Sequence, residues 1–327
     1  MTVGSFRVLS ESPRPDADER TRPRSTRRPK EAPKMPESPK KPKFNPALDN
    51  YAERASYRQI KCELFTVEGF SRAPVKTFWR VPEFKLGFDL GWQPWEFMGT
   101  PRYFVSHTHM DHILALPAYV ARRRMMKMEP PTIYLPAEKV AEVRQLLGVF
   151  CRLDQGALPC ELIGVKPGDE IDLSRELVVS VHKTYHSTPS VGYVVWERRK
   201  KLKPEFLELS GDEIRDLNLS GVEISYELRF PRVAFLGDSS ARGLDENPAM
   251  FEADVLIAEM TRISSRRNDG LKKGGHMRVE DYVDRRDKFK NQKIIASHFS
   301  VRYPQREIEA EVRKKIPDML DGRLVLV

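Results

Sequence analysis

Cysteine is scarce in this sequence of 327 residues, which has only Cys62, Cys151 and Cys160. These three form no C-x-x-C pair and no even set, which argues against a disulfide framework and against a zinc site built from thiolates. Scattered free cysteines are typical of a reducing compartment. We therefore expect a cytoplasmic protein in which the thiols only pack against their neighbours.

Long apolar runs are missing as well. No stretch approaches the roughly 18 consecutive apolar residues that suggest a membrane span. The first ten residues lack the apolar core of a signal peptide. The sequence thus predicts a protein that neither enters a membrane nor is exported.

The first 43 residues contain few large apolar side chains. They hold eight of the 25 prolines, and their twelve Lys and Arg residues against six Asp and Glu supply +6 of the formal net charge of +9. Such a segment cannot bury enough apolar surface to offset the entropy lost on ordering. We predict a disordered, basic, proline-rich arm over residues 1–50 and one folded domain over 51–327.

From Tyr51 onward, short runs rich in β-branched and aromatic residues alternate with turns and helical patterns. Strands are expected over 76–91, 101–107, 131–136, 161–165, 170–186, 191–199, 232–238, 253–260 and 293–300. Helices are expected over 113–128, 138–150, 280–289 and 304–316, the first with Leu114, Ala118 and Ala121 on one face. Strands mixed with helices in both halves predict an α/β sandwich.

Histidine is also scarce, but three of its seven residues fall within the stretch HTHMDH at 107–112. Four ligand-type side chains this close together at a strand end would be costly to bury unpaired, so the stretch predicts a metal site. His186, Asp238 and His298 likewise follow apolar runs, after VVSVHKTY, VAFLG and KIIAS. Side chains at strand ends can converge on one edge of a sheet.

The donor types indicate the metal. Imidazole and carboxylate without thiolate suit zinc or a similar ion in a hydrolytic role. There are more donors than one tetrahedral ion needs, and two ions sharing a carboxylate would account for the surplus. Taken singly, each residue has a structural alternative: His182 or His186 as a satisfied core histidine, Asp238 as a turn or helix cap, and His298 as a core residue.

Taken together, HTHMDH, His186, the Gly237-Asp238 pair and His298 resemble the signature of the metallo-β-lactamase fold, which implies an αββα sandwich with a dinuclear metal site at one edge. HFSVRY (298–303), IAEMT (257–261) and GGHM (274–277) resemble the closing motifs of ribonuclease Z, the endonuclease that removes the 3′ trailer of precursor tRNA. The stretches around 116–136 and 201–224 are most similar to the short-form, plant and organelle-type branch. The resemblance spans roughly residues 60–325.

This resemblance implies a ligand set for two zinc ions per chain, with Mn²⁺ as an alternative. One ion would be held by His107, His109 and His186, and the other by Asp111, His112 and His298. Asp238 would bridge the two ions together with the hydroxide that attacks phosphorus.

The resemblance also implies roles in proton transfer. Asp111 would orient or deprotonate the nucleophile, and Glu259 with His276 would help to protonate the departing 3′-oxygen. His182 has no such role and is expected to be structural. GDSS stands where the family usually has GDT, and IAEM where it usually has a His-Glu-Ala-Thr run, but neither change removes a charged ligand.

RNA contacts are the least defined part of the prediction. The interval between His186 and Asp238 lacks the Gly/Pro-rich tract that many family members carry, and we expect it to be compact. Its basic run RRKKLK supplies candidate phosphate contacts. The candidates are Arg198, Arg199, Lys200, Lys201 and, later in the chain, Arg302. A solvated face is the alternative for the basic run, and also for Arg122, Arg123 and Arg124.

Three functions compete at this point. The first is an endoribonuclease that acts on precursor tRNA, which the resemblance implies to be a homodimer. The second is a hydrolase of the same fold that acts on a small ester, thioester or cyclic phosphodiester. The third is an RNA-binding protein with an inactive metal site, which the complete ligand set argues against. HFSVRY, Glu259 and His276 favour the endoribonuclease.

Overall fold

The computed structural model describes residues 57–263 and 275–327. The arm predicted over residues 1–50 lies outside the described residues, and so does Gly274 of the GGHM motif.

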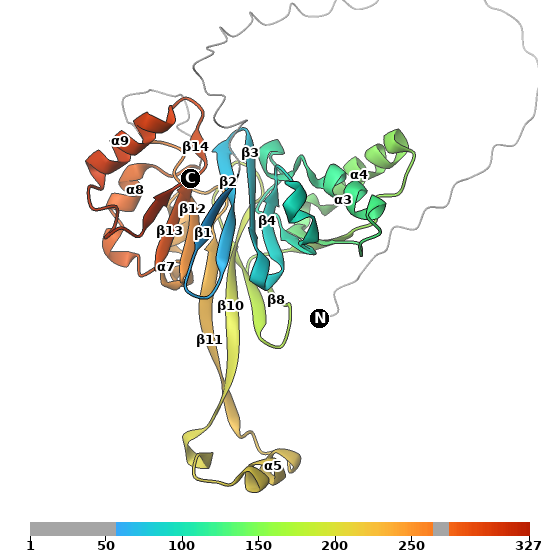
Figure 1. Ribbon diagram of the computed structural model, residues 1–327, viewed down its shortest axis with the longest axis vertical. Helices are drawn as coiled ribbons and strands as arrows, with labels where there is room; N and C mark the ends of the chain where they lie inside the picture. Colours follow the sequence, from blue (N-terminus) through green and yellow to red (C-terminus); the bar gives the residue numbers. More distant parts are fainter. Residues whose placement is uncertain (1–56, 264–274) are drawn as a thin grey trace, which may run out of the picture.

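Two β-sheets packed face to face form the centre of the molecule (Figure 1). The first sheet has the order β1 (Arg58–Lys61), β2 (Thr66–Ala73), β3 (Lys76–Val81), β4 (Leu86–Leu90), β5 (Arg102–Phe104), β6 (Thr132–Pro136) and β7 (Glu161–Val165), with β14 (Phe299–Ser300) paired to β2. The second has the order β15 (Leu324–Leu326), β13 (Lys293–Ser297), β12 (Val255–Glu259), β11 (Ser225–Phe235), β10 (Val191–Leu202), β9 (Leu177–Lys183) and β8 (Glu170–Asp172).

Alternation of side chains along the strands builds three apolar layers, because successive residues of a strand face opposite sides of the sheet. Phe104 of β5 and Tyr134 of β6 stack in the core between the sheets, with ring centroids 4.5 Å apart. Their neighbours Tyr103 and Ile133 face the other way and join a core beneath the helices. The second sheet has the same arrangement on its own outer face.

Helices cover both outer faces. The first sheet carries α3 (Leu116–Met125) and α4 (Val140–Asp154), and the second carries α6 (Arg242–Asp245), α7 (Pro248–Glu252), α8 (Val279–Val283) and α9 (Gln305–Lys315). Short 3₁₀ turns lie at Pro82–Phe84, Trp95–Gly99, Ala137–Lys139, Pro204–Phe206 and Arg286–Lys288. The predicted αββα sandwich is therefore confirmed.

Two local predictions need adjustment. The helix expected from residue 113 begins at Leu116, after the short α2 (Met110–Ile113). Leu114 is 62% exposed, and the buried face of α3 instead contains Leu116, Tyr119 and Val120. The expected strands 76–91 and 170–186 each divide in two, at the turns that precede β4 and β9.

The interval between His186 and Asp238 is not compact, so that prediction was wrong. β10 and β11 pair from Tyr193↔Phe235 out to Leu202↔Ser225, and their distal part leaves the sheet as a two-stranded ribbon (Figure 1). The ribbon ends in a small head, residues 203–224, that contains α5 (Gly211–Leu219). Because the ribbon lies outside the core, neither of its faces has to bury apolar side chains. The sequence of its strands can therefore be as polar as that of a loop.

Candidate metal centre

The candidate ligands meet at one edge of the sandwich, because each follows a strand that ends there. The HTHMDH stretch follows β5, His186 follows β9, Asp238 follows β11 and His298 follows β13. Their ligand atoms form two groups, each with all its atoms within 4.8 Å of one another: His107, His109, His186 and Asp238 in the first, and Asp111, His112 and His298 in the second. A third such group joins Asp238 and His298 to His276. The structure therefore brings together all seven residues that the resemblance implied.

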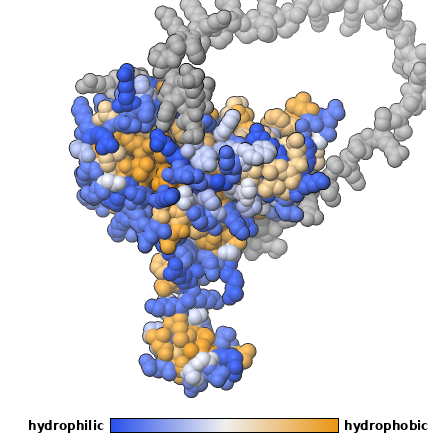
Figure 2. All heavy atoms as spheres, in the orientation of Figure 1, coloured by the Kyte–Doolittle hydropathy of each residue, from blue (hydrophilic) through white to orange (hydrophobic). Residues whose placement is uncertain are grey.

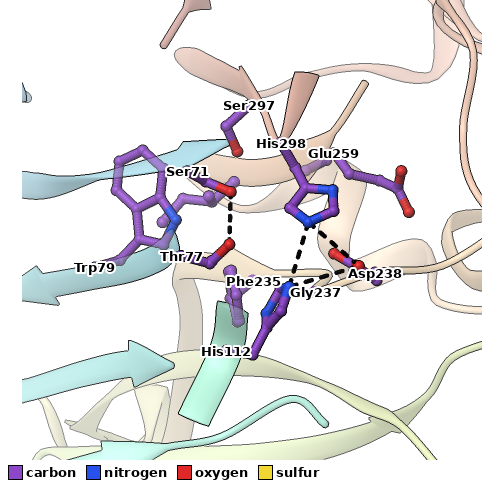
Figure 3. Close-up of a pocket in the computed structure, with 12 residues that line it drawn as sticks. Ser71, Thr77, Trp79, His112, Phe235, Gly237, Asp238, Glu259, Ser297 and His298 are labelled. Atoms are coloured by element: carbon purple, nitrogen blue, oxygen red, sulfur yellow. Dashed lines mark hydrogen bonds and ion pairs between the residues drawn. The ribbon is translucent and has the colours of Figure 1, made fainter. Parts of the chain in front are cut away.

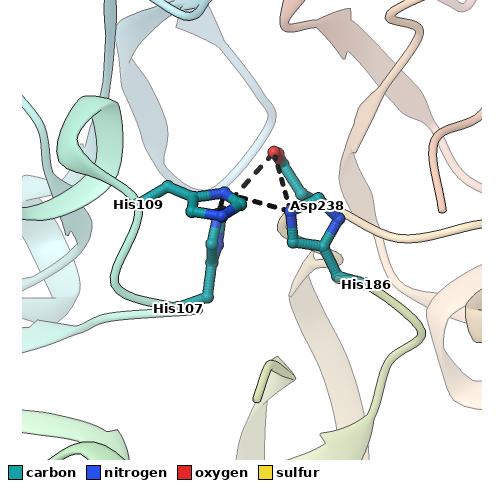
Figure 4. Close-up of side chains that lie close together, drawn as sticks. All are labelled: His107, His109, His186 and Asp238. Atoms are coloured by element: carbon teal, nitrogen blue, oxygen red, sulfur yellow. Dashed lines mark hydrogen bonds and ion pairs between the residues drawn. The ribbon is translucent and has the colours of Figure 1, made fainter. Parts of the chain in front are cut away.

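The first group contains three imidazoles and a carboxylate (Figure 4). His109 Nδ1 lies 3.0 Å from His107 Nε2 and 3.1 Å from His186 Nε2. Asp238 Oδ2 lies 3.8 Å and 3.9 Å from the same two Nε2 atoms. Nitrogen ligands around a tetrahedral zinc ion at about 2.0–2.1 Å stand roughly 3.3 Å apart, so the three imidazoles have a separation that suits one ion.

The second group contains Asp111, His112 and His298, and Asp238 lies close to its two imidazoles (Figure 3). His298 Nε2 lies 3.3 Å from both His112 Nε2 and Asp111 Oδ2. Asp238 Oδ2 lies 3.5 Å from His112 Nε2 and 3.4 Å from His298 Nε2. One oxygen of Asp238 thus contacts both groups, which is the placement that a bridging ligand requires.

Burial and charge set the protonation states at the centre. Burial lowers the pKa of His107 well below its usual value and that of His186 to about 4, so both imidazoles are neutral, the form that binds a metal. Burial alone would raise the pKa of Asp238, but His298, His112 and His107 hold it well below its usual value.

Asp89 is a supporting residue that the sequence did not reveal. It is fully buried at the end of β4, and its carboxylate accepts hydrogen bonds from His112 Nδ1 at 2.6 Å and from the Ser106 amide at 2.7 Å. The bond to Nδ1 fixes the tautomer that presents His112 Nε2 to the centre. A lone aspartate within the apolar run GFDLG carries no local signal of this role.

Two glycines allow the strand ends to approach. A Cβ on Gly91 would lie 1.7 Å from the carbonyl oxygen of Asp111, so no side chain fits there. Gly237 has φ +65° and lies against Ser106, where a Cβ would come within 2.6 Å. Both positions hold backbone next to a candidate ligand.

Glu259, which is buried, and His276, which is partly exposed, form a pair beside the ligands. His276 Nδ1 lies 2.9 Å from each carboxylate oxygen of Glu259, which also accepts a 2.7 Å hydrogen bond from the Ser239 amide. Burial lowers the pKa of His276, but the Glu259 carboxylate outweighs burial and raises it to about 9. The hydroxyl of Thr261, which sequence reasoning also missed, donates to Glu259 and lies 3.1 Å from His298 Nδ1.

His182 lies outside both groups. Its Nε2 is 2.7 Å from Ser180 Oγ and its Nδ1 is 2.9 Å from Asn247 Oδ1. With both ring nitrogens engaged in the fold, it has the structural environment that we expected.

The basic candidates divide into paired and unpaired residues. On β10, Arg198 forms a 2.7 Å ion pair with Asp172 and Arg199 a 2.5 Å pair with Glu197, whereas Lys200 and Lys201 are exposed and form no ion pair with the described residues. Arg302 is exposed just after β14.

The arginines of α3 bind to neighbouring segments of the chain. Arg123 is buried and donates to the carbonyl oxygens of Met98 and Glu129. Arg122 donates to the Gln93 carbonyl oxygen and Arg124 pairs with Asp154 at 2.9 Å. No helix in the described ranges is long and apolar enough to cross a membrane.

Comparison with known proteins decides the family. The chain is 37% identical over 270 residues to tRNase Z TRZ1 of Arabidopsis thaliana, an alignment that covers 82% of this chain and 96% of that protein. This chain belongs to the tRNase Z family. It is also 33% identical over 258 residues to the chloroplastic tRNase Z TRZ2 of the same plant, covering 78% of this chain and 73% of the relative.

The fold has solved counterparts too. The metallo-β-lactamase fold protein YhfI from Bacillus subtilis matches with a TM-score of 0.54 at 14% identity, covering 79% of this chain and 91% of that one. No family model matches the sequence. As a member of the tRNase Z family with this fold, the protein is an endoribonuclease of tRNA processing, that is, a phosphodiester hydrolase.

Proposed function

We propose that this enzyme is a zinc-dependent endoribonuclease that removes the 3′ trailer of precursor tRNA, with two ions held at the centre. The observation that carries the proposal is the position of Asp238, whose Oδ2 lies within 3.9 Å of ring nitrogens from both ligand groups. The donor set fits zinc, since it combines imidazoles with carboxylates and contains no thiolate. We assign His107, His109 and His186 to one ion, Asp111, His112 and His298 to the other, and Asp238 to both.

Two such cations supply Lewis acidity to a phosphodiester and make water acidic enough to act as a nucleophile near neutral pH. We assign to Asp111 the role of orienting that water; its side chain is one-tenth exposed, and its Oδ2 lies 3.3 Å from His298 Nε2 and 3.6 Å from His112 Nε2. The protein's own proton donor is His276. Its Nδ1 is engaged by Glu259, so the proton available to the departing 3′-oxygen is the one on Nε2.

Lys200 and Lys201 are our preferred phosphate contacts, since their charges are not neutralised by described residues. Arg198 and Arg199 would each have to give up an ion pair in order to bind a phosphate. Arg302, just after β14, is an exposed candidate outside the ribbon. The head beyond them has six acidic residues against two basic ones and a surface rich in apolar side chains (Figure 2), so we place the RNA along the ribbon rather than on the head.

We also propose that the enzyme is a homodimer. The outer surface of α3 and α4 exposes apolar side chains that the described residues leave uncovered. Met125 of α3 is 75% exposed and Leu153 of α4 is 72% exposed. Leu146 and Val149, also in α4, are 41% and 42% exposed. Such a patch is typical of a protein contact. Light scattering of wild type and Leu153→Glu would test this, and a monomeric wild type would contradict it.

The remaining assignments rest on the sequence. We propose that residues 51–327 form one hydrolase domain, that residues 1–50 form a basic arm, and that the enzyme works in the cytoplasm. The three cysteines are free and partly buried, as a reducing compartment allows.

Cleavage of a precursor tRNA that carries a 3′ trailer tests the proposed function. We expect one discrete cut beside the acceptor stem, with a 3′-hydroxyl on the tRNA and a 5′-phosphate on the trailer, and no cut by His107→Ala. Activity confined to a small ester, thioester or cyclic phosphodiester would support the alternative hydrolase instead.

A further inference from the structure

An open hollow with a volume of about 410 Å³ adjoins the metal centre. His186 lines it, but Glu259, His276 and His298 do not. Its other walls come from the ends of β6 and β9, the turn after β7 and the loop 184–190 before β10, so it lies at the same sheet edge as the ligands. Pockets of about 300–1,000 Å³ commonly hold small ligands or single groups of larger ones.

The lining has the chemistry of a nucleotide site. The hydroxyls of Ser187 and Thr188 form no hydrogen bond with the described residues, whereas those of Thr184 and Ser190 bond to each other at 2.7 Å and tie the loop together. The ammonium group of Lys183 lies 5.0 Å from the centre of the Tyr185 ring and forms no ion pair within the described chain.

Two neighbouring charges bear on this site. Glu138 adds the one carboxylate of the lining, an acceptor for ribose hydroxyls or base amino groups. Arg242 lies 4.2 Å from the centre of the same Tyr185 ring, but it does not line the hollow and is neutralised by Glu246 at 2.6 Å. Lys183 is therefore the cation that the hollow offers to a phosphate.

We propose that this hollow receives the first nucleotide of the 3′ trailer and that Lys183 binds the phosphate that follows it, an inference that rests on the proposed function. The direction follows from the leaving group. Cleavage leaves the 3′-oxygen on the tRNA, so the tRNA side of the scissile phosphate faces the proton donor His276. Neither His276 nor Glu259 lines the hollow, which meets the centre through His186. The ring of His186 lies 4.9 Å from that of His276, and we assign the trailer, which keeps the phosphate, to the hollow's side of this pair.

The test uses two precursor tRNAs that differ at one linkage. In one of them the phosphate between the first and second trailer nucleotides is replaced by an uncharged methylphosphonate. For wild type we expect the neutral linkage to lower kcat/KM about two- to fivefold, the range of an exposed charge pair. Lys183→Met should lower kcat/KM on the natural precursor by a similar factor, mainly through KM, and should no longer distinguish the two substrates. Arg242→Met is the matched control and should keep the wild-type discrimination.

Two outcomes would overturn the proposal. One is an equal penalty for the neutral linkage in wild type and Lys183→Met. The other is that Lys183→Met loses its sensitivity to a methylphosphonate placed on the tRNA side of the cut instead, which would put the acceptor end in the hollow. If wild type cleaves neither precursor, the proposed function itself fails, and that result is distinct from both.

Discussion

Replacing Asp89 should weaken metal binding from a distance, since this carboxylate contacts a ligand and is not itself in either ligand group. It is fully buried and accepts from His112 Nδ1 at 2.6 Å, from the Ser106 amide at 2.7 Å and from the Ser106 hydroxyl at 2.9 Å. Asp89→Asn keeps the size but removes the charge that orients the imidazole. Loss of such a partner typically costs about 10–100-fold in metal affinity, or roughly 1.4–2.7 kcal/mol.

Asp89→Ala should do more, because it also leaves buried donors unsatisfied at about 1–3 kcal/mol each. The assay is a competition for zinc against a chromophoric chelator, with urea unfolding of the metal-free proteins measured alongside. Asp245→Asn is a control, since this carboxylate of α6 pairs with Arg285 and lies outside both ligand groups. The reasoning fails if Asp89→Asn binds zinc as tightly as wild type, or if only the stability of the metal-free protein changes.

Three further predictions follow from the same geometry. Gly91→Ala puts a Cβ 1.7 Å from a backbone oxygen in the ligand-bearing stretch and should lower both the melting temperature and the zinc content. The control Gly99→Ala, whose Cβ meets nothing within 4 Å, should change neither, and equal melting curves for the two variants would contradict this. His276→Ala should keep both metals and lose about 10²–10⁴-fold in tRNA cleavage. It should hydrolyse a nitrophenyl phosphodiester almost normally, because nitrophenolate departs unprotonated, and equal losses on both substrates would refute the role of His276 as an acid. Lys200→Ala and Lys201→Ala should each weaken precursor binding and reduce the salt slope by about one; an unchanged slope would remove them from the interface.

The position of the site at one sheet edge could be predicted, because it depends only on which residues directly follow the apolar strands in the sequence. HTHMDH, Asp238 and His298 each follow an apolar run, and strands that end at one edge bring such residues together. The αββα layers were predictable for the same reason, since strand and helix periodicities mark which faces are buried.

The supporting contacts could not be predicted, because they join residues that carry no local signal. Asp89 is 23 positions from His112, and Thr261 lies 37 positions from His298. The ribbon of β10 and β11 was missed because pairing of polar strands is stabilised by backbone hydrogen bonds, which no side-chain pattern displays. Leu114 was assigned to the wrong face because it precedes the helix and faces solvent.

The central claim is that two ions, joined by Asp238, act together on a tRNA phosphodiester. The most direct test is to add zinc stepwise to metal-free enzyme while measuring single-turnover cleavage of a precursor tRNA with a 3′ trailer. The account predicts that the rate rises until two ions are bound per chain, and that Asp238→Ala shows no such rise. A rate that reaches its plateau at one ion per chain would contradict it.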